Sequence, residues 1–176
     1  WMPGTSMIAS LGMFVFGTAY TSAQIGLALC LWGAMILAYW LGLYYAGSSR
    51  IAWMAGLLTL FSGFFTDMWG QTDTFAPYAF FGAGALLFMA LGISSEKHNL
   101  RYWILAGVFS ACGHLIRSDG LILLLVGWSV LIWFFNQERY RQRLIWILTF
   151  TLAYLLLMSP WFARNLTEIG RILPTG

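Results

Sequence analysis

The chain has 176 residues, of which 60% are hydrophobic and only 9% are charged. An ordinary soluble domain has about 25% charged residues, so these proportions exclude a globular protein with a water-covered surface. The net charge is +3, and the basic residues are too few and too scattered to follow a nucleic-acid backbone. The composition therefore predicts an all-α integral membrane protein that has the lipid bilayer, and no nucleic acid, as its partner.

The first predicted element is a short apolar helix close to the start of the chain. Residues 3–17 lie between two Gly-containing turns and hold too few apolar positions to cross a hydrocarbon layer about 30 Å thick. A helix of this length suits the membrane interface, where it lies along the surface. We therefore predict that residues 1–20 form a segment on the outer face of the membrane.

Charged residues divide the rest of the chain into apolar stretches. A spanning helix needs roughly 20 residues, and about 17 to 25 are tolerated. Backbone polar groups in lipid must be satisfied within each segment, so each stretch is predicted to be a helix. About six such stretches are found, at residues 22–46, 51–66, 74–93, 102–117, 119–135 and 144–162. They predict a single polytopic domain over residues 1–176, with transmembrane helices within residues 22–165 and the start of an outer loop at 166–176.

Small residues within these stretches are predicted to let neighbouring helices approach closely. They include Gly26, Gly33, Gly82, Gly84, Ala106 and Ser110. Cys30 and Cys112 lie in apolar runs without the Cys/His spacing of a metal site. We interpret both cysteines as packing residues, and the sequence indicates neither a disulfide framework nor a zinc site.

Basic residues are distributed unequally between the two sets of loops. The richer set contains Arg50, Lys97, Arg101, Arg139, Arg141 and Arg143. The poorer set contains Arg117, Arg164 and Arg171. Cytoplasmic loops carry the excess of Lys and Arg, so the richer set is predicted to face the cytoplasm. The acidic residues of the poorer set then face the periplasm or lumen; they are Asp67, Asp73, Asp119 and Glu168.

The predicted outer face carries charges that could form a site. Arg117 and Asp119 lie in a tight break between two apolar helices, and Arg164 ends the last span on the same face. A charge at the centre of a bilayer helix costs about 2.5 to 3.5 kcal/mol, so charges near helix ends snorkel or line a wet cavity. One interpretation is a local ion pair with a snorkelling Arg164. The other is an outer pocket in which guanidinium groups bind a phosphate through paired N–H donors.

Two further residues on this face have a structural and a functional interpretation. Asp73 is placed to cap the helix that continues through Pro77, a residue tolerated in a first turn. It could equally contribute a carboxylate to the outer pocket. His114 precedes Arg117 by one helical turn. A lone histidine near a helix end is usually a hydrogen-bonded structural residue, and the alternative is a ligand of the same pocket.

Several short motifs follow one another along the chain in the order seen in one known family. They are Pro3-Gly4 with Val15-Phe16-Gly17, Asp73 at the head of a helix, Gly113-His114-Leu115-Ile116-Arg117-Ser118-Asp119-Gly120-Leu121, and Pro160-Trp161 with Arg164-Asn165, Gly170 and Pro174. Together they resemble the GT-C superfamily of polyprenyl-phosphate-dependent glycosyltransferases, which includes protein O-mannosyltransferases and lipid A aminoarabinose transferases. Ser118 stands where this family usually has proline, and Asp119 where it usually has glutamate.

The resemblance implies transfer of a sugar from a polyprenyl-phosphate donor to a glycan, lipid or protein acceptor on the periplasmic or luminal face. It implies a bacterial inner-membrane location and assigns the lipid-phosphate site to Arg117, Asp119, Arg164, Asp73 and His114. A divalent metal is compatible with this chemistry, but no ligand cluster in the sequence indicates one.

The family's catalytic carboxylate lies in the first outer loop, which would precede Trp1. The chain opens on Trp1 rather than on methionine. We therefore expect a fragment of a longer protein that is inactive alone and whose catalytic residues are unknown.

Two alternatives from other classes remain. A transporter or permease fragment would also carry charges on one face, but it would be expected to have ionisable or helix-breaking residues near the midplane of several spans. The stretches here have almost none. A purely structural membrane subunit would leave the outer charges unexplained.

Overall fold

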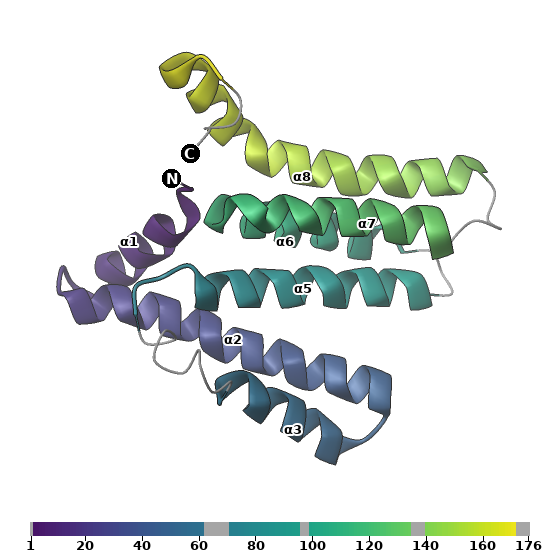
Figure 1. Ribbon diagram of the computed structural model, residues 1–176, viewed down its shortest axis with the longest axis horizontal. Coiled ribbons are helices and arrows are strands. Elements are labelled where there is room, and N and C mark those ends of the chain that lie inside the picture. The colour runs from purple at the N-terminus through teal and green to yellow at the C-terminus, as the bar shows by residue number, and fades with distance from the viewer. Residues whose placement is uncertain (1, 62–70, 96–98, 135–139, 172–176) are drawn as a thin grey trace.

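The computed structural model describes residues 2–61, 71–95, 99–134 and 140–171, and these ranges contain helices and no strand. The described helices are α1 (Gly4–Phe16), α2 (Tyr20–Ala46), α3 (Ser49–Leu60), α5 (Phe75–Ser94), α6 (Leu100–Ile116), the 3-10 turn η2 (Ser118–Gly120), α7 (Leu121–Phe134) and α8 (Tyr140–Ile169). Figure 1 shows them as a bundle of roughly parallel and antiparallel helices, with α1 set at an angle at one end. The predicted all-α bundle is therefore confirmed.

The helix lengths fit a protein that crosses the membrane several times. Three described helices, α2, α5 and α8, are long and apolar enough to span a bilayer, and α1, α6 and α7 are shorter apolar helices. The predicted stretch at 51–66 begins in α3, while its last part lies outside the described residues. The last helix runs past both predicted ends of the stretch at 144–162, from Tyr140 to Ile169. The chain is thus a multi-pass membrane protein.

The helices pack in a simple order. α3 packs against α2, α2 against α5, α5 against α6, and α6 against α8, while α7 contacts both α6 and α8. The core lies mostly around α6 and α8, where Trp103, Trp146 and Phe150 are at most 1% exposed. The rings of Trp103 and Trp146 stack with centroids 6.5 Å apart. Because α6 lies between α5 and α8, its end positions the residues of the site described below.

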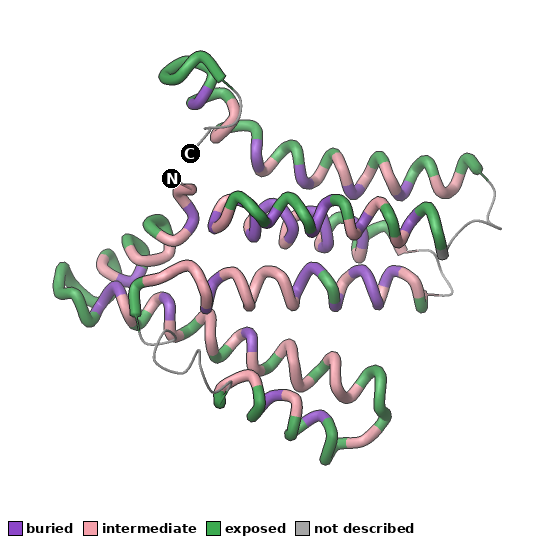
Figure 2. The backbone as a smooth tube through the Cα atoms, in the orientation of Figure 1, coloured by how far each residue is buried: buried purple, intermediate pink, exposed green. Residues whose placement is uncertain are grey.

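The outer surface of the bundle is strongly apolar. Large side chains on it are exposed, including Phe14 at 88%, Trp133 at 83% and Leu156 at 72%. Figure 2 shows that buried positions face neighbouring helices, whereas much of the outward side of α7 and α8 is exposed. A water-soluble monomer rarely exposes so much contiguous apolar surface. Lipid chains are as apolar as these side chains, so a bilayer is the suitable solvent.

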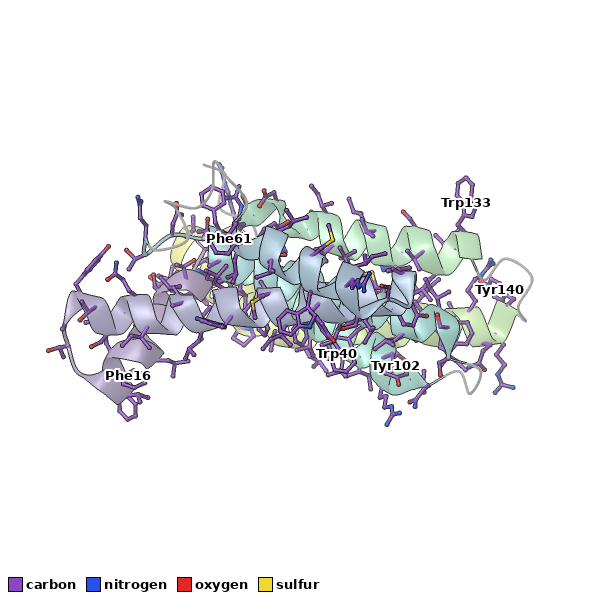
Figure 3. All side chains as sticks on the ribbon, turned by 90° about the horizontal axis from the view of Figure 1, so that it is seen from below. Phe16, Trp40, Phe61, Tyr102, Trp133 and Tyr140 are labelled. Atoms are coloured by element: carbon purple, nitrogen blue, oxygen red, sulfur yellow. The ribbon has the colours of Figure 1, made fainter. Side chains whose placement is uncertain are left out.

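Aromatic and basic residues mark the two ends of the bundle. Figure 3 shows Phe16 near one end and Trp133 and Tyr140 near the opposite end. The second end also carries the first turns of α3, α6 and α8, with Arg50, Arg101 and Arg141. Trp and Tyr are enriched at membrane interfaces. The architecture therefore separates a basic end from the end that carries the connection between α6 and α7.

We expect reporter domains fused after Gln142 and after Gln71 to signal from opposite sides of the membrane. Gln142 lies in the first turn of α8 at the basic end, whereas Gln71 precedes α5 at the other end. The positive-inside rule predicts a cytoplasmic signal after Gln142 and an extracytoplasmic signal after Gln71. Fusions to a phosphatase and to a fluorescent protein measure this directly. Reversed signals would contradict the orientation and would place the charged turn in the cytoplasm.

Candidate functional site

The connection between α6 and α7 is a tight turn that fixes the positions of Arg117 and Asp119. The Arg117 N–H donates to the carbonyl of Gly113 at 3.0 Å, and the Gly120 N–H donates to the carbonyl of Arg117 at 2.9 Å. A Cβ at Gly120 would lie 2.6 Å from the carbonyl oxygen of Gly113. Since a backbone atom cannot move aside easily, only glycine allows the turn to fold so closely onto the end of α6.

Arg117 joins this turn to the start of α5. Its Nε lies 3.0 Å from Asp119 Oδ1, and its Nη2 donates to Asp119 Oδ2 at 3.1 Å. Its Nη1 donates to Thr74 Oγ1 at 3.2 Å. The guanidinium also lies over the rings of Phe75 and Tyr78, at 5.4 and 5.6 Å from their centroids. We call Arg117, Asp119, Thr74, Phe75 and Tyr78 the Arg117 cluster. Its cation is held by a two-pronged ion pair and by aromatic faces.

The ion pair also shifts the titration of both partners. Hydrogen bonding to the Arg117 guanidinium lowers the pKa of the Asp119 carboxyl below its ordinary value. The same contact with Asp119 raises the pKa of the Arg117 guanidinium. The two side chains are 33% and 46% exposed, so water and salt screen part of their attraction. Asp119 is thus held as a carboxylate at neutral pH.

We expect the contribution of Asp119 to stability to persist well into the acid range. Its pKa is lowered in the folded state, so the contribution is complete above the unfolded value and is lost only as pH falls through the folded value. The difference in unfolding temperature between the wild type and Asp119→Asn, measured in detergent, should stay constant from about pH 8 to about pH 5. It should shrink only below that range. A difference that disappeared near pH 6 would assign the effect to another group.

Asp73 lies at the edge of the Arg117 cluster. The structure differs from the predicted capping role, because α5 begins at Phe75 and Thr74 occupies the N-cap position. The Asp73 carboxylate instead accepts the N–H of Thr74 and lies 3.2 Å from the Thr74 hydroxyl. Its negative charge contributes to the raised pKa of Arg117. Asp73 therefore hydrogen-bonds to Thr74, the residue that Arg117 contacts. It does so from the position that precedes the N-cap.

His114 is buried between α6 and α8. It is 2% exposed, and its Nδ1 is hydrogen-bonded to the hydroxyl of Tyr154. The two rings also stack, with centroids 6.0 Å apart. This environment matches the structural interpretation, in which the histidine satisfies its polar atoms inside the bundle. A ligand-binding role for His114 stays a prediction.

Arg164 lies beside a separate pocket on the other side of α6. The pocket has a volume of about 930 Å³ and is formed by α1, α6 and α8, with Met2 in front of α1. Among the described residues that line it, Arg164 carries the only charge; the others include Pro3, Cys112, Leu157 and Trp161. The Arg164 guanidinium lies 5.0 Å from the ring centroid of Trp161. We call this hollow the Arg164 pocket.

α8 bends beside this pocket. Pro160 lies inside the helix, where its missing N–H and its ring interrupt the helical hydrogen bonds. Figure 1 shows the last part of α8 turning away from the axis of the bundle at its far end. A bend at an internal proline has this ordinary cause. Arg164 follows Pro160 by about one turn, and both residues line the pocket together with the end of α6.

The structure therefore divides the predicted site into two groups at one end of the bundle, with His114 buried apart from both against Tyr154. Arg117, Asp119 and Asp73 lie together at the start of α5, and Arg164 lies beyond α6 with α1 and α8. Leu115 lines the Arg164 pocket only two residues before Arg117. The end of α6 is consequently the wall between the two groups.

Sequence reasoning missed several residues of this region. Thr74 and Tyr154 bind Arg117 and His114 through their hydroxyl groups, and a hydroxyl on its own gives no signal in the sequence. Trp161 was detectable in principle, because its spacing of three from Arg164 places the two side chains on one helix face. The contribution of α1 to the pocket depends on tertiary packing and was not visible in the sequence.

Comparison with known proteins identifies the family. Neither a curated protein nor a solved structure matches the chain. The family model described as dolichyl-phosphate-mannose-protein mannosyltransferase matches residues 2–163, a range that includes α1 to α7, the Arg117 cluster and most of α8. The resemblance inferred from the sequence motifs is thereby confirmed. The chain belongs to the dolichyl-phosphate-mannose-protein mannosyltransferase family of membrane glycosyltransferases.

Proposed function

We propose that this protein transfers a sugar from a polyprenyl-phosphate donor to an acceptor on the extracytoplasmic face of a bacterial inner membrane. The observation that carries the proposal is the Arg164 pocket, in which Arg164 is the one cation among the described lining residues and lies among mostly apolar side chains at the end of a membrane bundle. A lipid phosphate is complementary to this pocket, because it carries one anionic group on a long apolar chain. Guanidinium groups suit phosphate oxygens because they donate two parallel N–H bonds.

The chemistry of transfer explains why a cation is needed. When the bond between the sugar and the phosphate breaks, negative charge grows on the departing lipid phosphate. A fixed donor that faces this charge stabilises the transition state more than the ground state. No carboxylate is among the described residues that line the pocket of Arg164, so its charge is available to an anionic ligand. We assign this role to Arg164 first.

The Arg117 cluster has a supporting role in this proposal. Arg117 already forms an ion pair with Asp119, which reduces the charge that it offers to a ligand. The guanidinium can still contribute to the positive potential at this end of the bundle, and it fixes the end of α6 against α5. The acceptor's proton requires a carboxylate base. Asp119 is poorly suited to that task, because its lowered pKa makes it a weak base.

The test is to follow a labelled sugar in membranes that contain the full-length protein to which this chain belongs. Polyprenyl-phosphate mannose carrying labelled mannose is supplied on the extracytoplasmic side, and the label is separated into donor lipid, other lipid, glycan and protein fractions. We expect label to leave the donor fraction faster than in matched membranes without the protein. Equal rates would contradict the proposed enzyme activity with this donor. Uptake of the intact donor or of free sugar into vesicles would instead support the transporter alternative.

A further inference from the structure

Trp161 is the aromatic residue that the Arg164 guanidinium contacts, and both residues line the Arg164 pocket. They lie three positions apart on α8, so their side chains share one face of the helix. The Arg164 Cζ lies 5.0 Å from the centroid of the Trp161 ring. This distance is within the roughly 6 Å over which a cation and an aromatic face attract each other, and tryptophan gives the strongest attraction of this kind.

The core of the bundle fixes the Trp161 ring in place. Trp161 is half-buried and packs against the buried cluster that includes Tyr154 and Met158. Arg164 is exposed, and an exposed arginine side chain has many rotamers to choose from. A ring held by the core therefore gives the guanidinium one preferred position beside the pocket.

Arg164 and Arg117 are held in different ways. The Arg117 guanidinium donates N–H groups to Asp119 and Thr74, and the carboxylate of Asp119 offsets its charge. Among the described residues, none accepts a hydrogen bond from the Arg164 side chain and none forms an ion pair with it. An aromatic face attracts a cation but brings no carboxylate oxygen to its N–H donors and adds no net negative charge. The contact with Trp161 thus holds Arg164 without neutralising it.

We propose that Trp161 is a positioning residue for sugar transfer, whose ring fixes the Arg164 guanidinium while its charge and N–H donors remain available to the departing phosphate. This inference rests on the proposed function, because it takes Arg164 to be the group that faces the lipid phosphate. A donor stabilises a transition state best when it is already in place before the charge develops. A carboxylate in place of the ring would compete with the phosphate for the same paired N–H donors.

The test uses the full-length protein to which this chain belongs, in proteoliposomes, with polyprenyl-phosphate mannose as the labelled donor. Trp161→Leu removes the ring. Trp161→Phe keeps an aromatic face, and it breaks no hydrogen bond to the described residues, because Trp161 Nε1 has no partner among them. Phe162→Leu is the matched control, since Phe162 packs against the same core cluster but is not among the described residues that line the pocket.

We expect Trp161→Leu to lower the rate of transfer by about tenfold, a change within the strength of a cation–π contact from which lipid has excluded water. Trp161→Phe should give a rate between those of Trp161→Leu and the wild type. Phe162→Leu should transfer at close to the wild-type rate when equal amounts of folded protein are compared. The unfolding temperature of each variant measures the loss of packing separately.

The decisive measurement combines Trp161→Leu with Arg164→Ala. Without a guanidinium to position, loss of the ring should lower the rate no further than Arg164→Ala does alone. A ring that served only to pack the core would lower the rate by the same factor whether or not Arg164 were present.

Three results would overturn the inference. They are a normal rate in Trp161→Leu, an equal loss in Trp161→Leu and Phe162→Leu, and the same loss from Trp161→Leu with and without Arg164. If Arg164→Ala slows transfer while any of these results is found, the phosphate-binding role of Arg164 stands and only the positioning role of Trp161 fails. If Arg164→Ala transfers sugar at the wild-type rate, the proposed function loses its main support and the positioning role fails with it.

Discussion

Replacement of Arg164 by alanine is expected to lower the rate of sugar transfer by about 10²- to 10³-fold, the usual cost of losing one fixed donor in the transition state. The reason is that the departing lipid phosphate would develop its negative charge in a pocket without a cation. The rate is measured as release of labelled sugar from a polyprenyl-phosphate donor, in membranes adjusted to equal amounts of folded full-length protein.

Companion substitutions separate the geometry of Arg164 from its charge. Arg164→Lys keeps the charge but loses the paired N–H donors, so it should restore the rate only in part. Arg117→Ala should also lower the rate strongly, because it releases Asp119 and detaches the end of α6 from Thr74. Arg141 lies in the first turn of α8 at the basic end, and Arg141→Ala should leave the rate nearly unchanged.

The comparison among these variants decides between the interpretations of the charged residues. If transfer were equally insensitive to alanine at Arg164, Arg117 and Arg141, none of them would bind the phosphate. The local ion pair and a snorkelling arginine would then account for the charges on this face. A loss confined to Arg117→Ala would move the site to the start of α5.

The sequence predicted much of the fold because a bilayer imposes simple rules. Charges end the apolar stretches, and the length of each stretch then sets the length of a helix. The predicted stretch at 74–93 accordingly matches α5 (Phe75–Ser94) closely. The stretch at 144–162 was too short, because the polar residues near Arg164 were interpreted as the start of a loop. They continue α8 beyond the bend at Pro160 as far as Ile169.

The arrangement within the bundle was harder to predict, for a physical reason. In a membrane helix the side that faces lipid is as apolar as the side that faces another helix, so the periodic pattern of a water-soluble helix is lost. α7 illustrates this, since Leu124 and Leu131 are buried while Leu125 and Ile132 are exposed. The sequence therefore predicted that Arg117 and Arg164 lie at the same end of the bundle. It could not show that α6 lies between them.

The contacts of the small residues were also hard to predict from the sequence. Gly82 was among the predicted packing positions, yet nothing lies within 4 Å of the place where its Cβ would be. Gly107 was not among them, yet a Cβ there would collide with the carbonyl oxygen of Phe150 and lie 2.9 Å from the Cβ of Ala153. Which glycine permits a close approach depends on how the helices are rotated, and that rotation is a property of the packed bundle.

This contrast gives a matched pair of substitutions with opposite consequences. Gly107→Leu is expected to destabilise the bundle by about 1 to 3 kcal/mol or more, because overpacking against backbone atoms cannot be relieved by a change of rotamer. The added side chain would push α6 away from α8, separate His114 from Tyr154 and open the core around Trp103.

Gly82→Leu adds the same atoms in the middle of α5, where its first carbon meets open space. It should leave stability unchanged or raise it slightly, because glycine within a helix costs roughly 0.5 to 1 kcal/mol relative to alanine. Thermal unfolding in one detergent, followed by circular dichroism and by fluorescence of the buried tryptophans, compares the two variants. Equal unfolding temperatures for both variants would contradict the close approach of α6 and α8. In that case Gly107 would not set the distance between α6 and α8, and the core around Trp103 and Phe150 would tolerate a larger side chain at this position.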